Sequence, residues 1–390
     1  MQCVANLNVN EPPVAEARSR RRVLHVVGGL DRGGIETWLA RLTEAMRDDL
    51  DVHVAVLTPR PWSMEATLAR SARLYLVPRG GSILGFALRL RRLLDRLGPL
   101  DVVHAHVSFL SGVVVAVAAS AGVPVRIAHS HTDAGPGGNG GRMRRTYIGL
   151  MRMLIRRFAS HVAGSSSEAV SFLMGPTPRQ SGPEHVVLPL AIDVRPGARR
   201  APHGERTNRR LRIGHVGRFV EAKNHAKLID IARVLHEREV PFEMFFVGDG
   251  PLRAHVAETL VDAAYRDRVR LLGERDDVEA LLQERFDVFV FPSHVEGFGL
   301  AALEAQAAGL PCVISAHLPP ALSVLPEHVY RVDVSESSEA WADEIVRAHA
   351  SERLPAHVVE ARIAASPYSL SRSAAALFDL YTSRLCAAKR

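Results

Sequence analysis

The sequence predicts an α/β protein made of two doubly wound, Rossmann-like domains that face each other across a cleft. Short apolar runs alternate with segments of helical spacing, this alternation stops between residues 174 and 210, and it then begins again. Strands that alternate with helices form a parallel sheet with both faces covered. At about 150 residues per domain, a chain of 390 residues is also long enough for two domains.

The first half of the chain supplies the elements of one domain. Short apolar runs are expected to be buried strands, and apolar residues spaced three or four apart are expected to form helices. The uncharged stretch 107–125 is as long as a membrane span, but its serines, glycines and Pro124 indicate a buried helix followed by a buried strand. The expected strands are residues 23–27, 52–57, 74–77, 102–106 and 123–128, and the expected helices are residues 34–46 and 83–97.

The alternation restarts after a stretch rich in proline, glycine and arginine. The expected strands are residues 211–216, 242–247, 269–272, 288–291 and 312–315, and the expected helices are residues 224–236, 251–264, 278–284 and 300–308. The expected boundaries are a disordered tail at 1–20, a first domain at 21–195, a linker at 196–210, a second domain at 211–367 and a final segment at 368–390.

Charge and cysteine content narrow the class of protein. Residues 1–200 contain 26 basic and 15 acidic side chains, a balance of +11, whereas residues 201–390 contain 23 and 27, a balance of −4. A basic half indicates an anionic partner such as a phosphate or a membrane surface, and no motif points to nucleic acid. Three widely spaced cysteines offer neither a disulfide framework nor a metal motif, and the N-terminus lacks an apolar signal segment. We therefore expect a cytoplasmic protein.

Two glycine-containing segments stand between a predicted strand and a predicted helix, at the edge where doubly wound sheets bind ligands. Residues 28–34 match neither a dinucleotide fingerprint nor a P-loop, and an ordinary tight turn explains them as well as an anion site does. Residues 217–224 carry Arg218 and Lys223. A guanidinium fork and a compact ammonium can bind a diphosphate from two sides. Only three of the 49 basic residues are lysines, so Lys223 stands out at this place.

A third segment, residues 296–304, carries two carboxylates eight positions apart, Glu296 before a predicted helix and Glu304 within it. The glycines between them and the start of the helix would present amides to a phosphate. A hydrolase with paired carboxylates is the competing interpretation. Against it, the glutamates stand beside amides and cations that suit a phosphate leaving group.

Taken together, these motifs resemble the retaining GT-B glycosyltransferases of family four. The resemblance covers residue 23 to about residue 385. It implies that the first domain binds the acceptor, that the second binds a nucleotide sugar, and that residues 369–381 form a helix crossing back to the first domain. The motifs that carry it are residues 33–37, Gly217-Arg218 with Lys223-Asn224, residues 247–251, and Glu296 with Glu304.

The resemblance also implies roles for single residues. It implies that Arg218 and Lys223 hold the donor diphosphate, that Glu304 binds the nucleotide ribose, and that Glu296 lies at the transferred sugar. The turn at 273–275 is expected near the base. The remaining residues implied at the donor are Gly33, Gly34, Asp249, Gly250, Gly297, Phe298, Gly299 and Leu300.

The family further places a histidine of the first domain beside the reacting sugar. The candidates are His129 and His131, and we favour His131 because it lies further beyond the strand. His104 and His106 are weaker candidates. No cysteine or acidic residue has a matching metal-ligand spacing, so we expect no metal and no other cofactor.

Two further segments leave alternatives open. Residues 142–158 place Arg142, Arg145, Arg152 and Arg156 on one face of a helix and apolar side chains on another. Such a helix lies on an anionic bilayer or simply covers a core. The glycine-rich loop at 135–141 is either a lid over the acceptor or a plain flexible loop.

The expected function is transfer of a sugar, with retention, from a nucleoside-diphosphate sugar to an acceptor hydroxyl. Uridine is the commonest base in the family, and the acceptor is a saccharide, a lipid-linked saccharide or a natural product. Two alternatives remain open: a nucleotide-sugar epimerase on the same fold, and a non-catalytic subunit that binds sugar nucleotides. The sequence does not determine the oligomeric state.

Overall fold

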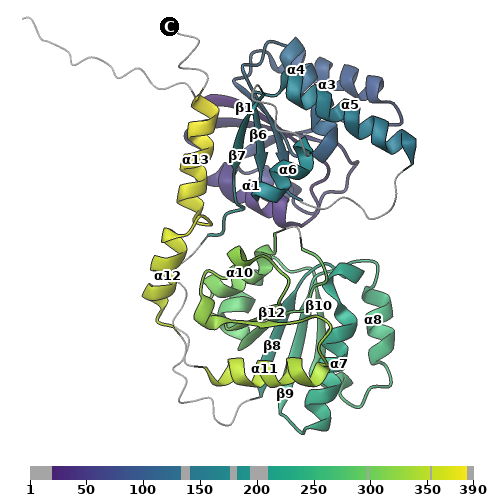
Figure 1. Cartoon of the computed structure of the whole chain (residues 1–390), viewed down its shortest axis with the longest axis vertical. Coiled ribbons are helices and arrows are strands. Elements are labelled where there is room, and N and C mark those ends of the chain that lie inside the picture. The colour runs from purple at the N-terminus through teal and green to yellow at the C-terminus, as the bar shows by residue number, and fades with distance from the viewer. Residues whose placement is uncertain are drawn as a thin grey trace, which may run out of the picture.

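The computed structural model describes residues 20–132, 141–175, 182–193, 210–296, 298–351 and 354–383. Figure 1 shows two lobes, one formed by the first half of the chain and one by the second, with the last helices running along one side of both. Each lobe contains one parallel sheet with helices packed against it. The predicted class, two doubly wound α/β domains, is confirmed.

The first sheet has seven strands in the order β3-β2-β1-β4-β5-β6-β7. Its central strands are almost wholly buried because helices cover both faces. The strands are β1 Arg21–Val27, β2 Leu50–Val56, β3 Ala72–Leu76, β4 Val102–Ala105, β5 Val125–Ser130, β6 His161–Gly164 and β7 Glu184–Val187. The helices are α1 Gly34–Ala45, α2 Glu65–Leu68, α3 Ile83–Leu97, α4 Ser111–Ser120, α5 Arg142–Phe158 and α6 Ser167–Met174.

The second sheet has six strands in the order β10-β9-β8-β11-β12-β13. Its strands are β8 Leu211–Val216, β9 Phe242–Val247, β10 Val269–Gly273, β11 Val288–Phe291, β12 Cys312–Ser315 and β13 Val329–Val332. The helices are α7 His225–Glu237, α8 Arg253–Leu260, α9 Val278–Ala280, α10 Leu300–Ala307, α11 Ser338–Ala350, α12 Ala356–Ala365 and α13 Leu370–Thr382. The helix expected at 278–284 is α9 followed by a π-helical turn, Leu281–Arg285.

The uncharged stretch 107–125 forms a helix and a strand, as predicted. A 3₁₀ turn, Ser108–Leu110, leads into α4, which is buried at Val113, Val114 and Val115. β5 then begins at Val125. No helix in the described part of the chain is long and apolar enough to cross a membrane.

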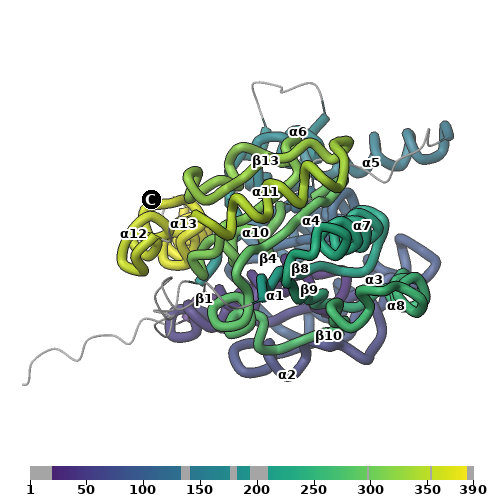
Figure 2. Tube along the Cα trace, turned by 90° about the horizontal axis from the view of Figure 1, so that it is seen from below, coloured from purple at the N-terminus to yellow at the C-terminus, as the bar shows by residue number. Residues whose placement is uncertain are grey.

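The end of the chain joins the two lobes. α12 contacts α10 of the second lobe, and α13 packs on α1 of the first. The Ile192 amide donates to the Tyr368 carbonyl (2.8 Å), so the chain leaving the first sheet is tied to the segment that returns to it. Figures 1 and 2 both place α12 and α13 together at one side of the molecule. The expected tail at 1–20 and linker at 196–210 lie almost wholly outside the described residues.

Candidate functional site

The loop after β8 carries Arg218 and Lys223 to the carboxyl edge of the second sheet. A 3₁₀ turn, Glu221–Lys223, ends at Asn224, whose backbone has a left-handed φ of 54°. The Asn224 side chain accepts from the Lys227 amide (3.3 Å), which caps α7, and donates to the Pro292 carbonyl (3.1 Å) after β11. These bonds fix the loop beside the segment that carries Glu296.

Lys223 and Glu296, predicted from separate motifs, form an ion pair. The Lys223 ammonium lies 2.5 Å from both carboxylate oxygens of Glu296. The Glu296 side chain is only 5% exposed and that of Lys223 is 19% exposed. The ammonium also lies 5.0 Å from the centre of the Phe291 ring. A largely buried cation with spare donors can bind an anion and remain paired with the carboxylate.

Arg218 is exposed, and among the described residues its guanidinium has no ion-pair or hydrogen-bond partner. No carboxylate of the described residues therefore neutralises its charge. The two cations of this loop thus differ in their surroundings. Lys223 is held in a largely buried ion pair, whereas Arg218 faces solvent.

The glycines after β9 brace the Arg218 loop. Gly248 has a φ of 132°, and a Cβ there would lie 2.1 Å from the Gly217 carbonyl oxygen, so only glycine fits. The Phe219 amide donates to the Asp249 carbonyl (2.9 Å). Two residues predicted at the base, Asp249 and Gly250, line an open cavity of about 350 Å³ together with Pro251, Arg253, Ala254, Ala257 and Leu271.

The start of α10 meets the first lobe. Gly299 has a φ of 75° and precedes the helix. Leu300 contacts the glycine loop of the first lobe, since a Cβ on Gly34 would lie 3.1 Å from Leu300 Cδ1. The Phe298 ring lies edge-on to Tyr368, with centroids 5.5 Å apart. Gly297, also expected at the donor, lies outside the described residues.

Among the described residues, two ion pairs link the lobes, and one involves a predicted ribose ligand. The Arg41 guanidinium on α1 lies 2.8 Å from the Glu304 carboxylate on α10. Arg32, in the glycine loop, pairs with Asp276 after β10. The sequence motifs gave no sign of Arg41, because its partner lies across the cleft. A ribose role for Glu304 therefore requires the carboxylate to share or exchange this partner.

Glu36 lies in the first turn of α1, three residues after Gly33. Burial raises the pKa of its carboxyl to about 7; a backbone hydrogen bond opposes this shift and the nearby Asp31 adds to it. At neutral pH this carboxyl is therefore only partly ionised. A phosphate at the neighbouring glycines would meet less repulsion than the sequence suggests.

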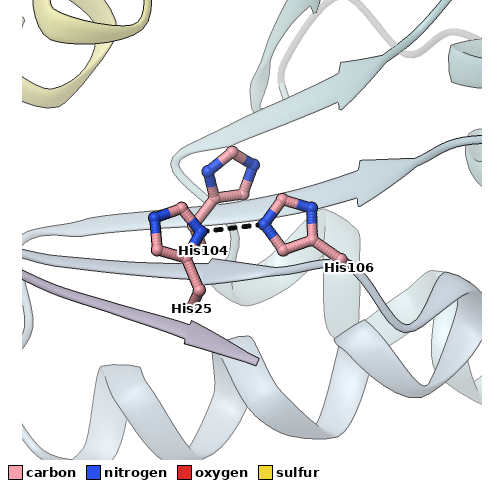
Figure 3. A group of neighbouring side chains, drawn as sticks. All are labelled: His25, His104 and His106. Atoms are coloured by element: carbon pink, nitrogen blue, oxygen red, sulfur yellow. Dashed lines mark hydrogen bonds between the residues drawn. The ribbon is translucent and has the colours of Figure 1, made fainter. Parts of the chain in front are cut away.

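The histidine predicted beside the sugar belongs to a larger cluster at the carboxyl edge of the first sheet. His25 is on β1, His104 on β4 and His129 on β5, while His106 and His131 follow β4 and β5. Figure 3 shows three of these rings, with the hydrogen bond between His25 Nδ1 and His106 Nε2 (2.9 Å). Burial lowers the pKa of all five, to about 3 for His25 and His131, so the rings are neutral at pH 7.

The cluster brings nitrogen atoms within reach of a metal ion. His25, His104 and His106 form one group whose ligand atoms lie within 4.8 Å of one another, and His106, His129 and His131 form another. However, both nitrogens of His25, His104 and His106 already take part in hydrogen bonds. A metal would have to break these bonds. The absence of a metal stays a prediction, and the bonding pattern favours it.

The basic helix expected at 142–158 forms α5, but its arginines do not act as one surface. Arg152 donates to the Phe172 carbonyl (2.8 Å) and Arg156 to the Met174 carbonyl (2.6 Å), at the end of α6. They satisfy carbonyls at a helix C-terminus. Only Arg142 and Arg145 of the predicted set are exposed. The loop at 135–141 lies almost wholly outside the described residues.

Sequence reasoning missed His25, Trp38, Arg41 and Tyr381. Trp38 on α1 presents its ring edge-on to His106, His129 and His131. His104 and His106, and likewise His129 and His131, are two apart, which places each pair on one face of the sheet. That spacing was the available signal for a cluster. Nothing near Tyr381 in the sequence indicates that its hydroxyl reaches His104.

Comparison with known proteins identifies relatives over most of the chain. A family model described as "Glycosyl transferase 4-like domain" matches residues 33–212, and one described as "Glycosyl transferases group 1" matches residues 199–363. The "Putative glycosyltransferase EpsF" of Bacillus subtilis (strain 168) is 34% identical over 378 residues, which cover 93% of this chain and 97% of that protein. A "Glycogen synthase" of Mycobacterium tuberculosis (strain CDC 1551 / Oshkosh) is 29% identical over 78% of this chain and 75% of its own.

Solved structures share the fold. The Anabaena protein Alr3699/HepE, in complex with UDP and glucose, has a TM-score of 0.69 at 18% identity and covers 93% of this chain and 99% of its own. A glycosyltransferase from Rickettsia africae ESF-5 has a TM-score of 0.70 at 14% identity, over 94% of this chain and 99% of its own. At these identities the likeness establishes the two-domain architecture alone.

Proposed function

The chain belongs to the GT-B glycosyltransferases of family four, and we propose that it transfers a sugar, with retention, from a UDP-sugar to a hydroxyl of a saccharide, lipid-linked saccharide or natural product. One observation carries the proposal: Lys223, on the same loop as the exposed Arg218, is paired with Glu296 of the segment after β11. This arrangement suits a diphosphate, because a buried ammonium and a free guanidinium can bind it from two sides.

Uridine as the base is supported by a structural relative. The Anabaena protein of the same fold was solved with UDP and glucose, and also with UDP-glucose. In this chain the base would lie at the cavity lined by Asp249 and Gly250. The ribose would lie at Glu304, where Arg41 now provides the partner.

The proposed chemistry uses charge that develops on the leaving diphosphate. Arg218, Lys223 and the amides at the start of α10 stabilise this charge more in the transition state than in the ground state. Lys223 is positioned by Glu296, whose carboxylate would lie at the transferred sugar, with His131 on the other side of the cleft. The acceptor oxygen bonds to the anomeric carbon on the face from which the diphosphate leaves, and its proton passes to the leaving diphosphate oxygen. Attack and departure on the same face retain the anomeric configuration. Double displacement through a carboxylate is the alternative route.

A ligand panel tests the proposal and its rivals. Thermal shifts are measured with UDP-, GDP- and ADP-sugars, and the nucleotide sugar that stabilises the protein is then incubated alone and with saccharide acceptors. Stabilisation by a UDP-sugar and release of UDP with acceptor present support the proposal. A 2-epimer formed without acceptor indicates an epimerase, and binding without turnover on any acceptor indicates a non-catalytic subunit. No response to any sugar nucleotide contradicts all three.

We also propose peripheral contact with anionic membranes through the outer face of α5. Met143 (87% exposed), Met153 (55%) and Leu150 (46%) lie on this helix with the exposed Arg142 and Arg145. Apolar side chains flanked by arginines suit an interface with acidic headgroups. Vesicles of phosphatidylglycerol should sediment the protein more than vesicles of phosphatidylcholine do. Met143→Asp with Met153→Asp should abolish the difference, whereas Val261→Asp in the second lobe should not.

A further inference from the structure

Five histidines of the first lobe and Tyr381 of α13 form one unbranched series of hydrogen bonds, which we call the histidine chain. Along the series, the heavy-atom distances are 3.0 Å (His129 Nδ1 to His104 Nε2), 2.9 Å (His104 Nδ1 to Tyr381 Oη), 3.4 Å (Tyr381 Oη to His25 Nε2), 2.9 Å (His25 Nδ1 to His106 Nε2) and 2.9 Å (His106 Nδ1 to His131 Nε2). Tyr381 is fully buried and belongs to α13, so the returning helix supplies the middle member.

The two ends of the histidine chain, His129 and His131, lie next to each other. His129 and His131 have ring centroids 3.9 Å apart. The end nitrogens, His129 Nε2 and His131 Nδ1, are buried and have no hydrogen-bond partner among the described residues. Every other ring nitrogen of the histidine chain makes a hydrogen bond to another member of the histidine chain. The series thus closes on itself except at one gap between two unpartnered nitrogens.

The number of protons in the histidine chain determines which end nitrogen can donate a hydrogen bond and which can accept one. A neutral imidazole carries one N–H and one lone pair, and a phenol carries one O–H. Five rings and one phenol supply six protons, and the five links use five of them. When all links are filled and the Tyr381 O–H is one of the donors, the sixth proton lies at one end of the histidine chain and the other end carries a lone pair.

An arrangement in which His104 Nδ1 and His25 Nε2 both donate to the Tyr381 oxygen would leave the buried phenol proton without an acceptor. Only two other proton arrangements fill every link. In one, all five histidines are protonated at Nε2, so His129 Nε2 donates and His131 Nδ1 accepts. In the other, all five are protonated at Nδ1, and the two ends exchange roles. A single ring with the opposite tautomer would place two protons, or none, in a neighbouring link, which leaves a buried polar group unsatisfied.

We propose that the histidine chain positions His131 by coupling its tautomer to that of His129, so that the pair always presents one donor and one acceptor to sugar hydroxyls. The inference rests on the proposed function for the identity of the ligand. Sugar hydroxyls both donate and accept, so they match one donor beside one acceptor without any charged group. Tyr381 and His104 act through His129 and His131 and are positioning residues.

The direct test is ¹⁵N NMR of histidine-labelled protein without ligand, which distinguishes protonated from unprotonated ring nitrogens. The expected result is one shared tautomer for all five histidines, or exchange between the two uniform sets. Tyr381→Phe keeps the ring but cuts the chain into His104 with His129 and His25 with His106 and His131, so mixed sets become allowed. Mixed tautomers in the wild-type protein would overturn the proposal. So would tight binding of one zinc ion per chain that is lost in His106→Gln.

A kinetic test separates positioning from support of the fold. The probe is UDP-glucose, and the readout is release of UDP by hydrolysis together with the calorimetric affinity for UDP. Tyr381→Phe should lower kcat/KM about tenfold, as loss of one buried hydrogen-bond partner does, with unchanged UDP affinity. Tyr75→Phe, which removes a tyrosine–histidine bond to His53 elsewhere in the same lobe, should change neither.

The two proposals fail in different ways. If the wild-type protein binds no UDP, the proposed function fails, while the tautomers still decide the histidine chain. If UDP binds and Tyr381→Phe hydrolyses UDP-glucose like the wild type, the histidine chain has no role at the sugar. Should Tyr381→Phe not fold, the wild-type spectrum decides alone.

Discussion

The carboxyl edge of the first sheet presents neutral rings that hydrogen-bond to one another, whereas the facing edge of the second presents charges. His129 and His131 are uncharged because they are buried. Lys223 and Glu296 remain close together as an ion pair, and Arg218 is exposed. The difference suits a sugar nucleotide, whose sugar offers hydroxyls and whose diphosphate offers charge.

From net charge alone, the first half of the chain would be expected to bind the anionic diphosphate. The first half of the chain is basic and the second acidic, yet the cations expected at the diphosphate belong to the acidic half. In the basic half, arginines such as Arg152 and Arg156 bind carbonyls at the end of a helix. A few placed groups therefore outweigh the overall balance of a domain.

The largest effect is expected at the charged edge. Lys223→Ala removes the ammonium proposed to bind the diphosphate and leaves Glu296 without this partner. We expect kcat/KM for sugar transfer to fall about 100- to 1,000-fold, as for loss of one group that stabilises developing charge. Steady-state kinetics at saturating acceptor provide the measurement.

Lys227→Ala is the matched control. Lys227 lies four residues later and donates to the Glu336 carbonyl (2.9 Å), away from Glu296. It should keep wild-type activity. Transfer that survives Lys223→Ala at the wild-type rate would remove the charged edge from the mechanism.

A smaller effect is expected at the neutral edge. His131→Ala would remove the proposed hydrogen bond to an uncharged sugar hydroxyl, and we expect kcat/KM to fall about tenfold. Because no charge is lost, this ratio should not change between low and high salt, whereas the effect of Lys223→Ala should shrink with salt. An equal salt dependence for both variants would contradict the contrast between the edges.

The pH dependence of Glu36 sharpens the comparison further. The pKa of Glu36 in the folded protein is about 7, above the ordinary value of 4.5. Below about pH 4.5 the carboxyl is therefore protonated in both the folded and the unfolded protein. Stability should therefore fall as the pH rises from about 4.5 to 7, because only the unfolded chain ionises there. Above pH 7 the ionised carboxyl should also repel a diphosphate at Gly33 and Gly34.

Glu36→Gln isolates this group. The ratio of wild-type to variant UDP affinity should fall severalfold between pH 6 and pH 8. The loss of stability between about pH 4.5 and pH 7 should be smaller in the variant than in the wild type. Calorimetry and thermal melts measure the two effects. A ratio that is constant over this range would show that Glu36 does not face the phosphates.

The smallest effect is expected for the pair that joins the lobes. Arg41→Ala removes a partly exposed ion pair with Glu304, which is typically worth about 1 kcal/mol or less. We expect a change of about two- to fivefold in kcat/KM. Arg47→Ala, just after the end of α1 and paired with Glu44 within the first lobe, should change nothing. An effect as large as that of Lys223→Ala would place Arg41 at the donor itself.

The sequence predicted the repeating elements and the motif loops, and missed what depends on distant partners. Alternating apolar runs identify β8 and β11, and glycine spacing identifies the loops after them, because these signals are local. Local spacing could not reveal that Lys223 and Glu296 meet. Arg41 and Tyr381 could not be found because their partners, Glu304 and His104, lie 263 and 277 residues away along the chain.

The roles assigned to Arg218, Lys223, Glu296, Glu304 and His131 stay predictions, and one measurement tests the central one most directly. It compares the calorimetric affinities of UDP and uridine for the wild-type protein and for Lys223→Ala. We expect UDP to bind the wild type at least about tenfold more tightly than uridine, since only UDP carries the diphosphate. In Lys223→Ala the preference should largely disappear. Equal binding of UDP and uridine by the wild type, or an undiminished preference in the variant, would contradict the account.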